Sequence, residues 1–200
     1  MRTCKVLLVA AFVAGTILTA SATTIDFELN GPCAFAQTSP LSNQYAGQGV
    51  LFSGPGPGQG GAVLDECANF GINAHSGRDF LAFNLHTYGI PPETITFSTP
   101  QSSVSIFAGD GLEAANAFTL AAFDSMNQQI GIDTVNNIEG QWELLSVNAP
   151  NIAYVTLNFT GTFAVFDDMS FAGGATTPEP GTLMLLGTGL LGVIARFRKF

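Results

Sequence analysis

Two pairs of carboxylates are the residue pattern in this 200-residue chain with the most direct chemical use. Asp26 and Glu28 stand two positions apart near the start, and Asp167 and Asp168 are adjacent near the end. Two carboxyl groups that flank a glycosidic bond can act as acid and as base or nucleophile. Sequence spacing does not set their separation in space, so a glycan-active hydrolase is kept as the third and least favoured interpretation.

Other catalytic patterns are missing from the sequence. His75 and His86 are the two histidines, and no G-x-S-x-G nucleophile elbow occurs. His75 and Ser76 are neighbours, which does not pair them as base and nucleophile, because a strand points adjacent side chains to opposite faces. We therefore expect no catalytic residues and a protein that is not an enzyme.

Aromatic side chains offer a different chemistry, since their faces stack on sugar rings. Trp142, Tyr88 and Tyr45 are the expected contacts if the protein binds a glycan, and Tyr154 is a further candidate. Trp142 begins an expected strand, where core packing is an equal alternative. Tyr45 could instead support the loop in which it lies.

The stretch GPGPGQGG at 54–61 contains a formal G-x-G-x-x-G match at Gly56, Gly58 and Gly61. That pattern indicates a dinucleotide site only between a parallel strand and a helix. Here a proline lies inside it, and alternating Pro and Gly do not support a strand. We interpret the stretch as a flexible turn.

Charge is scarce and unevenly placed. The chain has 6 Lys and Arg against 15 Asp and Glu, a formal net charge of −9, and only 10% charged residues against 46% hydrophobic ones. Arg78 is the one cation within 23–177, which contains fourteen of the acids. Nucleic-acid affinity comes from Lys and Arg, so a nucleic-acid partner is excluded. The low charge also excludes a disordered chain and a coiled coil.

Short segments of alternating polarity between turn residues predict an all-β fold, an antiparallel β-sandwich with Phe supplying most of the core. Ile25, Phe27 and Leu29 share one face of the first segment, and near the end the inward set is Val165, Met169 and Phe171. The ten expected strands are 24–29, 50–53, 80–85, 94–98, 103–108, 117–124, 129–133, 142–147, 152–159 and 163–171.

The N-terminus is typical of a secretory signal peptide, which we assign to 1–22. Arg2 and Lys5 precede an apolar run over 6–18, and Ala20 and Ala22 are small residues at the positions that signal peptidase requires. The alternative is an anchor that is not cleaved. In an exported protein Cys33 and Cys67 are expected to form a disulfide, with two buried thiols as the alternative.

The C-terminus places Pro178-Glu179-Pro180 before an apolar run over 182–195 and a basic end with Arg196, Arg198 and Lys199. This order resembles the PEP-CTERM sorting signal, which we assign to 175–200. The resemblance implies a membrane-embedded protease, exosortase, that recognises the motif and cleaves there. It also implies a Gram-negative host that makes exopolysaccharide.

The apolar run is expected to be a short membrane helix. Its fourteen residues are fewer than the roughly 20 that span a bilayer, which is compatible with a transient anchor in the inner membrane. The basic end would lie on the cytoplasmic side and the rest of the chain outside. A buried C-terminal strand or helix is the alternative.

Three short segments, Ile25–Glu28, Gln44–Ser53 and Phe166–Phe171, resemble jelly-roll sandwiches of the galactose-binding and carbohydrate-binding-module kind. The resemblance places the first and last strands of the ectodomain, 23–174, side by side. It also implies a structural calcium ion where they meet, because carboxylates brought together repel unless a cation lies between them. The expected ligands are Asp26, Glu28, Asp167 and Asp168, with Glu28 and Asp168 favoured by parity and Asp167 at a bulge.

Taken together, these patterns predict an exported, exosortase-processed protein of the cell surface or extracellular matrix, with a non-catalytic structural or interaction role. The alternative is a carbohydrate-binding module, with or without calcium, whose partner would be the exopolysaccharide.

Overall fold

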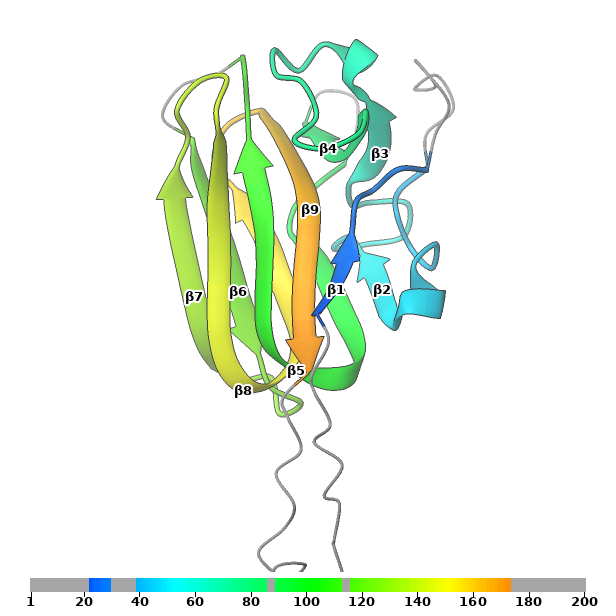
Figure 1. Ribbon diagram of the computed structural model, residues 1–200, viewed down its shortest axis with the longest axis vertical. Helices are drawn as coiled ribbons and strands as arrows, with labels where there is room; N and C mark the ends of the chain where they lie inside the picture. Colours follow the sequence, from blue (N-terminus) through cyan, green and yellow to red (C-terminus); the bar gives the residue numbers. More distant parts are fainter. Residues whose placement is uncertain (1–21, 30–38, 86–88, 113–115, 174–200) are drawn as a thin grey trace, which may run out of the picture. The chain divides into compact units, whose positions relative to one another are not determined.

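The alternating segments form nine antiparallel strands in a computed structural model, which describes residues 22–29, 39–85, 89–112 and 116–173 (Figure 1). The expected signal peptide, Cys33, His86, Tyr88 and the whole sorting signal lie outside the described residues. The strands are β1 (Ala22–Ile25), β2 (Val50–Ser53), β3 (Ala62–Asp65), β4 (Asp79–Asn84), β5 (Glu93–Gly109), β6 (Ala117–Phe123), β7 (Gln129–Asn136), β8 (Trp142–Phe159) and β9 (Phe163–Gly173).

Hydrogen bonding follows the order β3-β4-β9-β5-β8-β6-β7, with β1 added to β9 and β2 added to β5. The first half of β5 pairs with β2 and the second half of β8, whereas its second half pairs with β9 and the first half of β8. Register shifts between Thr96 and Ser103 bend β5 between these halves. Bends and bulges of this kind let one strand serve both layers of a sandwich.

The expected β-sandwich is confirmed, with three differences in its strands. The segments 94–98 and 103–108 are parts of one strand, β5, and 142–147 and 152–159 are parts of β8. Pro100 and its polar neighbours are typical of a turn, but they lie at the bend. β3 was not expected, because its sequence AVLD does not alternate; all four residues are buried.

The core of the sandwich is built from inward side chains of both layers, with Phe27, Phe83, Phe118 and Phe166 among its largest members. A smaller cluster of Leu64, Phe70, Phe80, Ala82 and Val165 packs on the other face of β4. Both faces of β4 are therefore buried, which holds the segment between β3 and β4 on the sandwich.

Two predicted inward residues face elsewhere. Leu29 is 45% exposed, because β1 ends at Ile25 and Phe27 takes the left-handed conformation with φ +57°. Val165 belongs to the small cluster rather than to the core with Met169 and Phe171. Asp168, with φ +47°, lies in a bulge of β9 that reverses the parity of the residues before it.

The segment between β3 and β4 also passes very close to the end of β5. Gly111 donates its N–H to the Phe70 carbonyl at 3.0 Å, and a Cβ at Gly111 would overlap the backbone of Gly71. The segment can lie here only because both glycines lack side chains.

We predict that Gly111→Ala lowers the free energy of unfolding by about 1–3 kcal/mol, the usual cost of overpacking. Gly47→Ala is the matched control, since a Cβ there meets no heavy atom within 4 Å. Urea denaturation of both variants measures the difference. Equal stability of the two variants would show that the close approach is not a constraint.

Candidate functional site

The two predicted carboxylate pairs lie next to each other at a gap in the pairing of β9. β4 pairs with Phe163–Phe166 and β1 pairs with Met169–Ala172, along the same edge of β9. Asp167 and Asp168 fall between the two neighbours. The predicted adjacency of first and last strands is confirmed. We call residues 26–29, 75–79 and 167–168 the acidic junction.

Asp167 is fully buried in the acidic junction and accepts three backbone hydrogen bonds. Its Oδ2 accepts from the N–H groups of His75 at 2.9 Å and Ser76 at 3.1 Å. Its Oδ1 accepts from the N–H of Asp168 at 2.7 Å. These N–H groups lie where β9 has no strand partner, so the carboxylate supplies the acceptors that a strand would otherwise provide.

Asp168 binds the side chains of the same two residues. Its Oδ2 lies 2.6 Å from His75 Nδ1, and its Oδ1 accepts from the Ser76 hydroxyl at 2.7 Å. The His75 ring stacks on Phe107, with 3.7 Å between ring centroids, and meets the edge of Trp142. In a hydrolytic triad the histidine bridges the serine and the acid. Here the acid bridges the other two, so Ser76 is not paired with a base.

Glu28 ties the end of β1 to the start of β4. Its Oε1 accepts from the N–H groups of Arg78 at 2.7 Å and Asp79 at 2.9 Å, and Asp79 Oδ2 accepts in return from the Leu29 N–H at 3.1 Å. Asp26 accepts from the Glu28 N–H. Backbone N–H groups thus surround the carboxylates that the sequence analysis assigned to calcium.

The acidic junction does not present a ready calcium cage. Among the described residues, no three His, Cys, Asp or Glu side chains are placed to hold a metal ion. One buried polar atom lies nearby, the Tyr45 hydroxyl, which has no hydrogen-bond partner within the described ranges. Burial raises the pKa of Tyr45, and the charges of Asp26, Asp79, Glu28 and Asp167 raise it further. Calcium stays a prediction.

Two of the three predicted glycan contacts, Tyr45 and Trp142, lie in the described residues. Tyr45 is 5% exposed, and its ring packs in the core against Phe27 and Phe52, which leaves no ring face for a sugar. Trp142 is half-buried and donates its Nε1–H to the Asn73 carbonyl at 3.1 Å, which fixes it to the segment before β4. Tyr88 lies outside the described residues.

Arg78, the one cation within the described ranges, donates to the buried Asp65 carboxylate at 3.2 Å. Asp65 also accepts from the N–H of Cys67, and Cys67 is disulfide-bonded. The predicted partner, Cys33, falls in a range that is not described. The glycine-rich loop at 54–61 joins β2 to β3 and is followed by a strand, which removes the context of a dinucleotide site.

Glu93, which the sequence analysis did not single out, is fully buried under the glycine-rich loop. Its Oε2 accepts from the Gly61 N–H at 2.7 Å, and its Oε1 has no hydrogen-bond partner among the described residues. Burial raises the pKa of Glu93 to about 8, against backbone hydrogen bonds from Gly61 and Ser53. Burial likewise raises the pKa of Asp167 to about 7, against its three N–H donors.

The C-terminal residues 176–199 match the PEP-CTERM protein-sorting motif. The chain carries a PEP-CTERM sorting signal. This signal marks an exported protein, and it confirms the assignment made from Pro178-Glu179-Pro180 and the residues that follow it. Within the part of the chain that the structure describes, no helix has the length and apolar character to cross a membrane.

Solved structures are similar to the chain that carries this signal, at low identity. The K2 cleaved adhesin domain of Lys-gingipain is 16% identical, with 77% of this chain and 99% of that one covered and a TM-score of 0.50. A DUF4465 family protein from Bacteroides caccae is 12% identical over 80% and 96%, with a TM-score of 0.48. The CBM22-1 xylan-binding domain from Paenibacillus barcinonensis is 14% identical over 78% and 97%, with a TM-score of 0.44.

A likeness at 16% identity shows the fold alone. A search of curated proteins found no match. The function must therefore be argued from the residues of this chain.

We predict that the protein loses stability as the pH rises. The carboxyls of Glu93 and Asp167 have folded-state pKa values of about 8 and about 7, above their ordinary values of 4.5 and 3.8. The folded state therefore holds protons that the unfolded state releases. Their stabilisation is full below about pH 4 and is lost as the pH rises through the folded-state values.

Glu93→Gln tests this directly, because Gln is neutral and similar in shape. Between about pH 5 and pH 7 the free energy of unfolding should fall less steeply in the variant, by up to about 1.4 kcal/mol per pH unit. Glu139→Gln, at an exposed position, is the control. Parallel pH profiles for wild type and Glu93→Gln would contradict a protonated Glu93.

Proposed function

We propose that the protein is a non-catalytic structural or interaction protein of the cell surface or extracellular matrix of a Gram-negative bacterium that makes exopolysaccharide. Exosortase processes it at Pro178-Glu179-Pro180, after a transient stay in the inner membrane. The observation that carries this proposal is the PEP-CTERM motif at 176–199, which follows directly on the antiparallel β-sandwich.

The arrangement of polar side chains supports the non-catalytic part of the proposal. The side chains of His75 and Ser76 both form hydrogen bonds with the Asp168 carboxylate. The Asp167 carboxylate accepts hydrogen bonds from three backbone N–H groups. These groups hold segments of the chain together. A general base, by contrast, must be able to reach the proton that it removes from a substrate.

Replacement of Pro178, Glu179 and Pro180 by alanine should leave the protein in the membrane fraction at its unprocessed mass, because the protease no longer recognises its site. Cell fractionation and mass measurement in the native host provide the readout. Gly173→Ala is the control, since a Cβ there meets nothing closer than 3.9 Å. Unchanged release of the triple variant would contradict processing at this motif.

A second candidate function, a carbohydrate-binding module, is favoured by one observation. The outer face of β2, β5, β8 and β6 combines a hollow lined by Leu51 and Thr96 with a stacked pair of aromatic rings, Tyr154 and Phe123. Exposed aromatic rings next to apolar hollows are surfaces on which sugar rings stack. The exopolysaccharide of the host is the partner that this function implies.

With either function, a calcium ion bound at the acidic junction would stabilise the folded protein. We propose that Glu28 and Asp168 are its ligands, assisted by Asp26 and Asp167. An ion that binds only the folded state must raise its stability. The melting temperature should therefore be several degrees higher in millimolar Ca²⁺ than in EDTA, and Glu28→Gln should abolish the difference. Equal melting temperatures in both solutions would contradict a structural calcium ion.

A further inference from the structure

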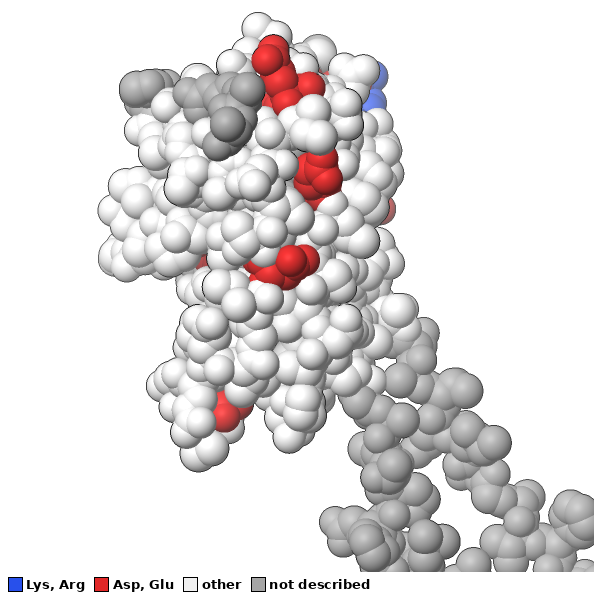
Figure 2. Space-filling view, turned by 90° about the vertical axis from the view of Figure 1, so that its left-hand side faces the viewer, with Lys and Arg blue, Asp and Glu red and all other residues white. Residues whose placement is uncertain are grey.

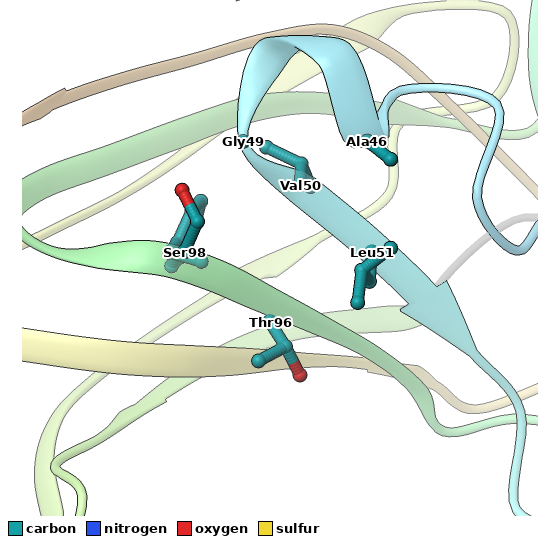
Figure 3. A pocket seen from close by; sticks show the side chains of 7 residues that line it. Ala46, Gly49, Val50, Leu51, Thr96 and Ser98 are labelled. Carbon is teal, nitrogen blue, oxygen red and sulfur yellow. The ribbon is translucent and has the colours of Figure 1, made fainter.

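A hollow lies on the outer face of the sandwich where β2 meets β5. Its volume is about 230 Å³, and Figure 3 shows Leu51 of β2 and Thr96 and Ser98 of β5 around it, with Ala46 at one side. Gly49, Val50 and Phe97 complete the lining. Leu51 is 49% exposed, so a large apolar side chain is available to a ligand.

Two aromatic side chains, Tyr154 and Phe123, lie on the same face of the sheet as this hollow and are called the aromatic pair. Thr96 pairs with Tyr154 of β8, and Tyr154 pairs with Phe123 of β6, so all three side chains leave the same face of the sheet. The rings of Tyr154 and Phe123 stack with 4.8 Å between their centroids and 5° between their planes. Phe123 covers the Tyr154 ring on the side of β6, and β5, which carries Thr96 of the hollow, is the neighbour of β8 on the other side.

Hydroxyl groups of threonine and tyrosine lie around the aromatic pair. Thr94 and Thr156 are directly paired on β5 and β8 and form the next row of the same face. The Tyr154 hydroxyl lies 3.3 Å from Asn127 Oδ1, beyond the ring. Directly opposite side chains on neighbouring strands are about 5 Å apart, so these groups are within reach of a ligand in the hollow.

The hollow itself is uncharged. None of the residues that line the hollow is ionisable, nor are Tyr154's neighbours Thr94, Thr156 and Phe123. The one cation in the described ranges, Arg78, is bonded to Asp65. On the side of the molecule that lies at the left of Figure 1, Figure 2 shows separate acidic patches, with basic atoms only at one edge. An anionic ligand would meet acidic groups and no free cation to attract it.

We propose that the hollow and the exposed face of Tyr154 form a binding site for a neutral saccharide segment. One sugar ring packs between Leu51 and Tyr154, and its hydroxyls bond to Thr96 and Ser98. Neither Trp142 nor Tyr45 lines the hollow. The inference rests on the second candidate function, carbohydrate binding, and names its site and the class of its ligand.

Affinity electrophoresis of the exported protein tests the site. The probes are neutral xylan and β-glucan, anionic polygalacturonate, and the exopolysaccharide of the host. Neutral polysaccharide should retard the wild type, and Tyr154→Ala and Leu51→Ser should each weaken the affinity by about tenfold or more, as the loss of an anchoring side chain does. Leu144→Ser is the matched control, because Leu144 is also 49% exposed but lies on the first half of β8, which pairs with the second half of β5.

Tyr154→Phe separates the ring from its hydroxyl and guards against loss of fold, since it keeps the stack with Phe123. It should bind within about twofold of wild type, and thermal denaturation should show that all variants are folded. Full binding by both Tyr154→Ala and Leu51→Ser would overturn the site and leave carbohydrate binding intact. Retardation by polygalacturonate alone would overturn the neutral ligand. No retardation by any of the four polysaccharides would remove the carbohydrate-binding function itself.

Discussion

Three backbone N–H groups that meet at one buried carboxylate, Asp167, are the constraint on which the ends of this sandwich depend. β1 and β4 share one edge of β9 and leave a gap between them, where the backbone has no strand partner. Asp167 fills the gap by accepting from His75, Ser76 and Asp168. Without this carboxylate the three part-buried N–H groups would lose their acceptor within the chain. The same interaction fixes the segment before β4, and with it Trp142.

The acidic residues and the uncharged surface therefore have different roles in the structure. The carboxylates of the acidic junction are turned toward backbone N–H groups within the chain, whereas the hollow at Leu51 and the ring of Tyr154 face outward without charge. Burial raises the pKa values of Asp167 and Glu93 to about 7 and about 8, above their ordinary values. An exported protein with this distribution of charge would repel anionic polymers rather than neutral ones.

Alternation was enough to predict the sandwich and most of its strands, because period two is a local property of strands. The adjacency of the first and last strands came instead from the resemblance to jelly-roll sandwiches, since no local pattern reports which strands pair. β3 was missed since its run AVLD is buried on both faces. The donors at Arg78 and Asp79 come from about fifty residues away from Glu28, and no local pattern reports them. The stack of Tyr154 on Phe123 depends on the register of β6 and β8, and Tyr45 is buried by a long-range contact with the ring of Phe27.

Amide hydrogen exchange at His75 and Ser76 tests the role of Asp167 most directly, in wild type and in Asp167→Asn. An amide side chain has one acceptor oxygen and cannot serve N–H groups on both sides. We predict that protection at His75 and Ser76 falls together in the variant, while Leu120 in the core of β6 stays protected. Unchanged protection at both amides would show that the gap in β9 is held without this carboxylate, and would contradict the account.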